Sequence, residues 1–324
     1  MQHMKEKYTT IEGIQKKASR LVYGTGTPYF FENDPEKAHA CLDRAWEAGF
    51  RTFDTAHTYG CSEELIGSWL SLRGVREEMV LIDKGCDPGQ KGHVEELSAQ
   101  TILDQVQESL DKLQTNYFDF YLLHRDDESR PVDEVVETLN QLKSDGIVTR
   151  FGVSNWRKHR ILEANRYAAS HGLDGFSAFS PSFSLADLAQ DLFGGSVTIS
   201  GDENKDIRGW LEETQLPVFN YSSLARGYLS GKYNPASGKP IEECLNPISI
   251  AEYDSPRNRV RLQRAFELAE QKNCSATQIC LAWVLNQKMN LFPIVSPGST
   301  EHMQENMDIL QMDLTEEEMK YLEA

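Results

Sequence analysis

The sequence has few basic residues for its length and no segment suited to crossing a membrane. Its 33 lysines and arginines against 50 aspartates and glutamates leave a net charge of −17 over 324 residues, which would repel a nucleic-acid backbone or an anionic membrane. No stretch approaches the roughly eighteen consecutive apolar residues of a membrane helix, and the opening MQHMKEKYTTIEGIQKKASR lacks the apolar region of a secretory signal. We therefore expect a cytoplasmic protein without nucleic-acid or membrane partners.

Closely spaced cysteine pairs are also absent. The six cysteines are dispersed and form no C-x-x-C motif, so neither a metal site nor a disulfide framework is expected. Cys61 lies two residues after Tyr59, and Cys86 lies two residues after Lys84. We interpret both as unreactive packing thiols, with a redox-sensing thiol as the alternative.

The sequence does contain a repeated alternation of helical and strand-like segments. From Asp34 onward the two kinds of segment alternate roughly every thirty to forty residues, as expected of βα units. The helix candidates span residues 34–49, with Asp34 as N-cap, then 101–113 and 131–146. Eight strand candidates are bounded by turn residues: 20–24, 50–54, 79–84, 118–124, 149–154, 175–180, 217–222 and 292–296.

Eight such strands with intervening helices predict an α/β protein of the closed (β/α)₈ TIM-barrel class, forming one domain over residues 1–324. An open, doubly wound sheet is the structural rival, and the absence of G-x-G-x-x-G after the first strand counts against it. Residues 225–257 are rich in Pro, Asn and Ser toward their end, and we interpret them as a loop or lid insertion.

Several strand candidates end on a polar or ionisable residue. A single such residue is more often a turn former or a structural group, but a series at the same end of successive strands favours a functional site. In a barrel, Asp54, Lys84 and His124 would converge, and Tyr59 would reach them from the loop after the second strand. The other strand-terminal groups are Ser154, Asn155, Ser180, Tyr221 and Ser222.

These four converging side chains suit the reduction of a carbonyl group. Lys84, kept cationic by Asp54, would favour a phenolate and lower the pKa of Tyr59 from its reference of about 10, making Tyr59 a proton donor. His124 could donate a hydrogen bond to a carbonyl oxygen or help to deliver the proton. None of these groups transfers a hydride, so the reaction would need a redox cofactor.

The motifs that contain these residues cover nearly the whole chain. They are G-F-R-T-F-D-T-A-x-x-Y-G-x-S-E-x-x-I-G from Gly49, then Lys84, LLHRD (122–126), FGVSN (151–155), YSSLARGYLSGKY (221–233), TQICLAWVLNQ (277–287) and STEHMQEN (299–306). This series resembles the aldo-keto reductase family. The resemblance implies a barrel that binds extended NADP(H) without a Rossmann motif and reduces aldehydes or ketones. It assigns Asp54, Tyr59, Lys84 and His124 as the catalytic set.

The resemblance also implies the cofactor contacts. Ser154 and Asn155 would hold the nicotinamide carboxamide, together with Ser180 where many members have a glutamine, and Asp54 would lie beside the ring. Tyr221 would stack on the nicotinamide, leaving its other face open to substrate. The remaining contacts would come from Gly26 and Thr27 near the first strand, and from Ser222, Leu224 and Arg226 around the pyrophosphate.

The adenosine end departs from the family pattern. The family often has Arg or Lys after the last strand to pair with the 2′-phosphate, whereas this chain has Gly298 and His302 at the alignable positions. Neither replaces a guanidinium, although Ser299, Thr300 and the first amides of the following helix are suited to phosphate. We therefore expect NADP(H), with weakened preference over NAD(H). The adenine contacts would be Glu305 and Asn306.

The substrate is less specified by the sequence. Tyr29, Phe30 and Trp156 predict an apolar, aromatic mouth for a small carbonyl compound. Two other functions stay open. One is a cofactor-binding regulatory barrel that acts through a protein partner, like the channel β-subunits of this family, and the other is a lyase in which Lys84 forms a Schiff base.

Overall fold

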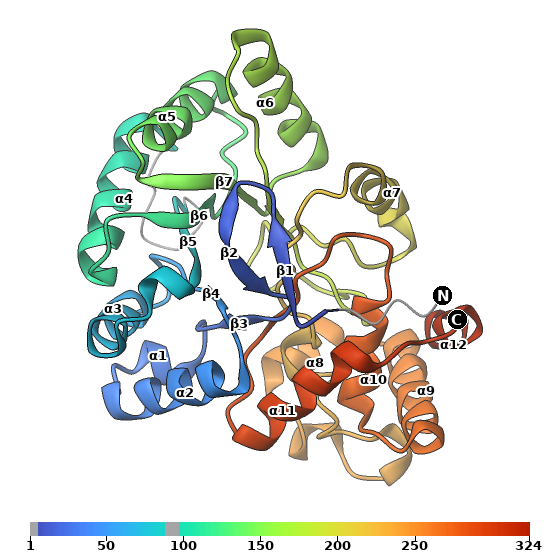
Figure 1. Ribbon diagram of the computed structural model, residues 1–324. Helices are drawn as coiled ribbons and strands as arrows, with labels where there is room; N and C mark the ends of the chain where they lie inside the picture. Colours follow the sequence, from blue (N-terminus) through green and yellow to red (C-terminus); the bar gives the residue numbers. More distant parts are fainter. Residues whose placement is uncertain (1–5, 88–96) are drawn as a thin grey trace. The chain divides into compact units, whose positions relative to one another are not determined.

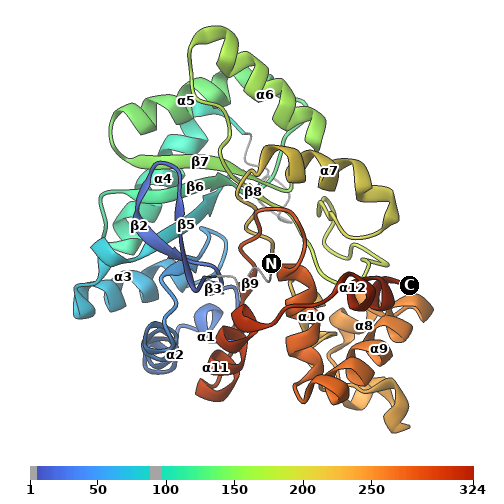
Figure 2. The same ribbon diagram turned by 45° about the vertical axis from the view of Figure 1, so that its right-hand side comes forward.

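The computed structural model describes residues 6–87 and 97–324, which form two compact units (Figures 1 and 2). The sheet unit comprises Tyr8–Ser180 and Ser296–Met303. The helical unit comprises Pro181–Val295 and Gln304–Ala324, together with residues 6–7. All four candidate catalytic residues belong to the sheet unit, so their mutual geometry is defined within one compact body.

Parallel strands form the centre of the sheet unit, in the order β8-β7-β6-β5-β4-β3. Each strand therefore pairs with its predecessor in the chain, and helices connect them on the outer face of the curved sheet (Figures 1 and 2). The strands are β3 Val22–Gly24, β4 Thr52–Asp54, β5 Val80–Gly85, β6 Phe118–Leu123, β7 Val148–Ser154 and β8 Phe179–Ser180. The helices are α1 Pro28–Phe31, α2 Pro35–Ala48, α3 Ser62–Arg73, η1 Arg76–Glu78, α4 Ala99–Leu113, α5 Val132–Ser144 and α6 Lys158–His171.

The outer helices begin and end where their capping residues require. The helix predicted from Asp34 is confirmed as α2: the Asp34 carboxylate accepts a hydrogen bond from the Lys37 amide at 3.1 Å, and Gly49 closes the helix at φ 99°. Helix α4 begins two residues before the predicted start at Thr101, because Ser98 caps it by accepting a hydrogen bond from the Thr101 amide. Among the helices of the described residues, none combines the length and apolarity that a membrane crossing requires.

A two-stranded hairpin that the sequence analysis did not predict covers the N-terminal ends of the parallel strands. It consists of β1 Tyr8–Ile11 and β2 Ile14–Ser19, joined by a tight turn in which Gly13 has φ 80°. The Ser19 hydroxyl accepts hydrogen bonds from the backbone amides of Arg51 and Thr52 at 2.9 and 3.0 Å, just before and at the start of β4. The hairpin leaves the opposite, C-terminal ends of the strands for the candidate site.

The helical unit contains mostly helices and turns. The strand expected at 217–222 is not formed: only single bridges pair Val218 with Leu291 and Ser182 with Tyr221, because Ser222 turns the chain at φ 53°. Residues 225–257 fold into short helical turns and α8, with Tyr228 and Tyr253 buried. The elements are η2 Asp202–Asn204, α7 Lys205–Thr214, η3 Ala225–Gly227, η4 Pro235–Ser237, η5 Ile241–Glu243, α8 Pro247–Tyr253, α9 Pro256–Lys272, α10 Ala276–Leu285, β9 Ile294–Val295, η6 Ile309–Gln311 and α12 Glu316–Glu323, with α11 Thr300–Asp308 beginning in the sheet unit.

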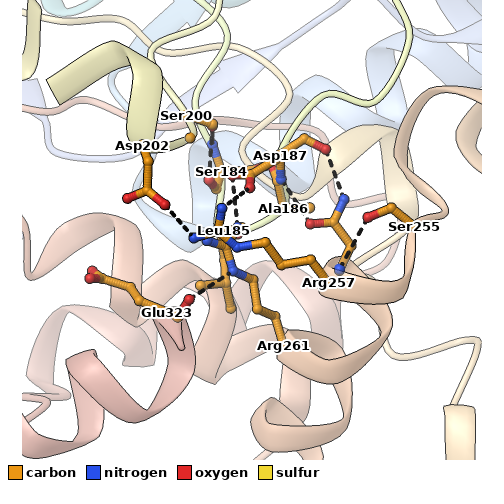
Figure 3. A network of polar contacts seen from close by, with 12 residues as sticks. Ser184, Leu185, Ala186, Asp187, Ser200, Asp202, Ser255, Arg257, Arg261 and Glu323 are labelled. Atoms are coloured by element: carbon orange, nitrogen blue, oxygen red, sulfur yellow. Dashed lines mark hydrogen bonds and ion pairs between the residues drawn. The ribbon is translucent and has the colours of Figure 1, made fainter.

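An ion-pair network ties α9 to the loop that opens the helical unit (Figure 3). The Asp187 carboxylate accepts from Arg261 at 2.7 Å and pairs with Arg257 at 3.2 Å, while Arg257 also reaches Asp202 at 2.8 Å. Arg261 donates further to the backbone carbonyls of Leu185 at 2.8 Å and Glu323 at 3.3 Å. The same two arginines thus fix a long loop and the C-terminal helix to α9.

Candidate active site

The strand register brings Asp54 and Lys84 onto the same face of the sheet. Asp54 pairs with Ile82 of the neighbouring strand, and Lys84 lies two residues further along that strand. Side chains two residues apart in a strand point to the same face, so the ammonium of Lys84 can reach the Asp54 carboxylate. The Nζ–Oδ1 distance is 2.5 Å, and Nζ also donates to the Thr55 carbonyl at 2.8 Å.

This ion pair is buried, and burial affects its protonation. Both residues are 2% exposed. Burial by itself would lower the pKa of Lys84, but the neighbouring Asp54 and Tyr59 outweigh it, and the pKa of the ammonium is raised above its usual value. Lys84 therefore stays cationic at neutral pH.

Tyr59 lies in the loop between β4 and α3, beside that cation. The Lys84 Nζ is 4.9 Å from the centroid of the Tyr59 ring. Gly26 makes room for the ring, because a β-carbon at that position would meet Tyr59 at 3.2 Å. A cation next to a phenol favours its phenolate form, the form that remains when a phenol has donated its proton.

His124 completes the group at the end of β6. Its backbone amide donates to the Gly85 carbonyl at 2.7 Å, and its ring meets the Tyr59 ring edge-on with 5.8 Å between centroids. Burial, followed by the charges of Lys84 and Arg125, holds the pKa of His124 well below its ordinary value. A neutral imidazole carries one N–H donor, which suits a hydrogen bond to a carbonyl oxygen.

The next two strands place polar groups at the same end of the sheet. Ser154 and Ser180 are paired in register, and the Ser154 hydroxyl donates to the Ser180 carbonyl at 2.8 Å. Asn155 adopts a left-handed conformation at φ 58°, and its side-chain amide donates to the His124 carbonyl at 3.2 Å and to the Ser154 hydroxyl at 3.1 Å. Hydroxyl and amide groups gathered beside the Tyr59–Lys84–His124 group have the hydrogen-bonding chemistry that a carboxamide requires, so these side chains fit the carboxamide of a nicotinamide.

The predicted adenosine-end residues of the sheet unit lie after Val295. Gly298 is exposed, and nothing lies within 4 Å of where a β-carbon would be. The Ser299 hydroxyl accepts from the His302 amide at 3.2 Å in the first turn of α11, which begins at Thr300. Thr27, whose amide donates to the Thr25 carbonyl at 2.7 Å, follows Gly26 at the end of β3.

The other predicted cofactor residues belong to the helical unit. The Tyr221 amide donates to the Pro181 carbonyl at 3.0 Å, and Leu224 precedes a turn in which Arg226 has φ 49°. Arg226 pairs with the buried Glu252 at 2.6 Å. Of the two adenine candidates in α11, Asn306 is buried, whereas Glu305 is exposed and its carbonyl accepts from Gln278 at 3.1 Å.

The aromatic mouth differs from the expectation. Phe30 and Trp156 are both 0% exposed, because Phe30 lies on the inner side of the short helix α1 and Trp156 packs on Phe176. Tyr29, the third predicted residue, is exposed at 43%, and so is Phe31 at 46%, which was not predicted. The Phe31 ring is 6.1 Å from the Tyr59 ring, so α1 brings an exposed aromatic side chain next to the candidate proton donor.

Sequence reasoning also missed two polar neighbours of His124. The Thr58 hydroxyl lies 3.4 Å from the His124 Nδ1, and the Asp87 carboxylate lies 4.0 Å from it. Asp87 also pairs with Arg125 at 3.1 Å. Thr58 directly precedes Tyr59, and Asp87 follows Lys84 by three residues. Their positions shortly after the ends of strands were the one sequence signal that could have placed them near His124.

A family model for the aldo/keto reductase family matches residues 20–324 of the chain. The chain belongs to the aldo/keto reductase family. It is 30% identical over 305 residues to norsolorinic acid reductase B of Dothistroma septosporum, covering 90% of this chain and 73% of that protein. It is 26% identical over 350 residues to a putative aryl-alcohol dehydrogenase of Schizosaccharomyces pombe, covering 98% and 95%.

Among solved structures, the glycerol dehydrogenase of Gluconobacter oxydans is similar with a TM-score of 0.76 and 22% identity, covering 98% of this chain and 94% of that one. At this identity the likeness shows the fold alone, which is TIM-barrel-like. As an aldo/keto reductase family member, the protein is an oxidoreductase, and the family supports a nicotinamide cofactor.

Proposed function

We propose that this aldo/keto reductase reduces aldehydes or ketones that carry an aromatic ring, and oxidises the corresponding alcohols in the reverse direction. The observation that carries the proposal is the group at the C-terminal strand ends: Tyr59 beside the Lys84–Asp54 ion pair, with neutral His124 edge-on to its ring. The aromatic substrate class is supported by exposed Phe31 and by relatives named as aryl-alcohol dehydrogenases.

Each side chain would have a distinct role in the reaction. When bound, the nicotinamide cofactor supplies the hydride for the carbonyl carbon. Tyr59 gives its phenolic proton to the carbonyl oxygen, and the adjacent Lys84 ammonium stabilises the phenolate that is left. Asp54 keeps that ammonium paired, and His124 orients the carbonyl oxygen by donating its N–H.

We further propose NADP(H) as the cofactor, held in the sheet unit along Ser154, Asn155, Ser180 and the residues after Val295. The contacts that the family resemblance implies for Tyr221 and Arg226 belong to the same proposal. We also propose that the chain closes a single (β/α)₈ barrel, which the TM-score of 0.76 over 98% of the chain supports. A reducing, cytoplasmic location is consistent with six cysteines that are all free thiols.

A panel assay tests the proposal. Oxidation of NADPH and of NADH would be followed by absorbance with benzaldehyde-type and aliphatic aldehydes of matched size, for the native chain and a Tyr59→Phe variant. The proposal expects turnover that favours the aryl compounds and is lost in the variant. Tight cofactor binding without turnover of any carbonyl would instead favour the regulatory barrel, and trapping of a carbonyl on Lys84 by borohydride would favour the lyase.

A further inference from the structure

An arginine of helix α2 reaches the loop where the adenosine end of the cofactor is expected. The Nη2 atom of Arg44 donates to the Gly298 carbonyl at 3.2 Å, across 254 positions of sequence, and lies 3.0 Å from the Cys41 sulfur. Arg44 and Gly298 both belong to the sheet unit. The segment of residues 296–306 contains no Arg or Lys of its own, and His302 is its one basic residue. The guanidinium of Arg44 therefore brings a positive charge to this segment from helix α2.

The charge of Arg44 is not neutralised by the protein. Among the described residues, no carboxylate lies within ion-pair distance of it, and its Nε atom is buried without a hydrogen-bond partner. By contrast, Arg73 on α3 pairs with Asp43 at 2.5 Å. In a chain of net charge −17, an arginine with no acidic partner within ion-pair distance in the described residues is an available anion contact.

The groups around Arg44 suit a phosphate. Ser299 offers a hydroxyl, and Gly298 leaves open space because no atom lies within 4 Å of its missing β-carbon. The carboxyl of the exposed Glu301 also lies in the field of Arg44: its pKa is lowered first by its own backbone amide and Ser299, and after them by the charges of His302 and Arg44. These groups therefore already stabilise one negative charge, that of the Glu301 carboxylate.

Resting on the proposed function, we infer that Arg44 is the specificity-determining cation that recognises the 2′-phosphate of NADP(H) in this protein, replacing the basic residue that Gly298 and His302 do not supply. The guanidinium keeps its contact to the Gly298 carbonyl through Nη2, its Nε stays buried, and it presents N–H groups of its terminal nitrogens to the phosphate oxygens. The preference for NADP(H) over NAD(H) then depends on a residue of α2, and not on the loop after the last strand alone.

Binding of adenosine nucleotides without a nicotinamide tests this role apart from catalysis. Isothermal titration calorimetry would compare adenosine 2′,5′-bisphosphate with adenosine 5′-monophosphate on the native protein, on Arg44→Met and Arg44→Lys, and on a Lys37→Met control. Lys37 lies on the same helix, is exposed and pairs with Asp34 at 2.7 Å, so its loss removes a positive charge of α2 elsewhere.

The native protein is expected to bind the bisphosphate at least tenfold more tightly than the monophosphate. Arg44→Met should lose about 10- to 100-fold in bisphosphate affinity and less than twofold in monophosphate affinity, Arg44→Lys should lie between, and Lys37→Met should match the native protein. An unchanged affinity ratio in Arg44→Met overturns the inference while leaving the proposed reductase intact. Failure of the native protein to bind either nucleotide overturns both. A misfolded Arg44→Met variant would also lose its affinity for the monophosphate, so the monophosphate titration identifies it. In that case the affinity ratio of Arg44→Lys tests the inference.

Discussion

The ammonium of Lys84 lies 2.5 Å from the carboxylate of Asp54, on adjacent parallel strands and almost entirely out of contact with solvent. Removing two charges from water is costly, and the pair is stable only because each charge neutralises the other. The Thr55 carbonyl accepts a further hydrogen bond from the same ammonium at 2.8 Å. The interaction thus fixes a cation at the point where Tyr59 follows strand β4.

Asp54→Asn should destabilise the protein as well as inactivate it. The substitution leaves the Lys84 ammonium buried without a counter-charge, which costs about 3–5 kcal/mol of the free energy of unfolding. Urea denaturation at pH 7 measures the loss. Glu128→Gln, which breaks an ion pair with Arg157 whose members are 48% and 70% exposed, is the matched control and should cost about 1 kcal/mol or less. Equal losses in the two variants would mean that burial of the pair is unimportant.

Tyr59→Phe should abolish proton donation but leave cofactor binding nearly intact. Because the phenol acts in the transition state, kcat for carbonyl reduction should fall by about 10²- to 10⁴-fold, while the Kd for NADPH changes by less than about twofold. Steady-state kinetics and quenching of protein fluorescence measure the two quantities. Tyr117→Phe is the control, since Tyr117 lies before β6 and its hydroxyl donates to Glu77 at 3.0 Å. A Tyr59→Phe variant with native kcat would remove Tyr59 from the mechanism.

His124 should make the protein less stable in acid. Its pKa is depressed by burial in the folded protein, so between about pH 6.5 and that lower pKa the unfolded chain binds a proton that the folded chain does not. The free energy of unfolding therefore falls as pH decreases through this window, by up to about 1.4 kcal/mol per pH unit for this one group. Urea denaturation from pH 7.5 to 5.5 should give a shallower slope for His124→Asn than for the native chain. The control His171→Asn, at an exposed position on α6, should keep the native slope.

Gly67→Ala should separate helix α3 from α4. A β-carbon at Gly67 would lie 2.2 Å from the Lys112 carbonyl oxygen, which is backbone and cannot turn away. The clash should lower the free energy of unfolding by about 1–3 kcal/mol. Gly209→Ala in α7 is the opposite case, because nothing lies within 4 Å of its β-carbon position, and it should stabilise the protein by about 0.5–1 kcal/mol. Thermal unfolding of both variants measures the two changes in stability. If both variants were destabilised, or both stabilised, the contact at Gly67 would not be the cause.

Phe31→Ala should reduce the preference for aromatic substrates. Loss of one ring–ring contact at the exposed site beside Tyr59 should lower kcat/KM for an aryl aldehyde by about 2- to 12-fold, and change that for an aliphatic aldehyde much less. Leu72→Ala, which removes an exposed apolar side chain from α3, should change neither value. If both substrates lost activity equally, Phe31 would have a general structural role in α1.

Periodicity, capping residues and turn chemistry in the sequence determined most of the βα units. The strands around Asp54, Lys84 and His124 and the helix after Asp34 were predicted with small errors at their ends, because their apolar runs and capping signals are local. The hairpin at the N-terminal strand ends was missed, and a strand at 217–222 was wrongly expected. Both errors have one physical cause: pairing partners and left-handed turns depend on what the chain meets elsewhere.

By itself, then, the sequence determined which residues are the candidates for the chemistry, since strand-terminal polar groups in a series of motifs can be selected by their spacing. Only the tertiary structure decided the distances between these residues, which of two adjacent phenylalanines is exposed beside Tyr59, and that Arg44 of α2 contacts Gly298. These contacts join residues that are far apart in the chain, and the exposed and buried phenylalanines lie on opposite sides of one short helix. Strand register and side-chain packing determine both features, and no local sequence pattern encodes strand register or packing.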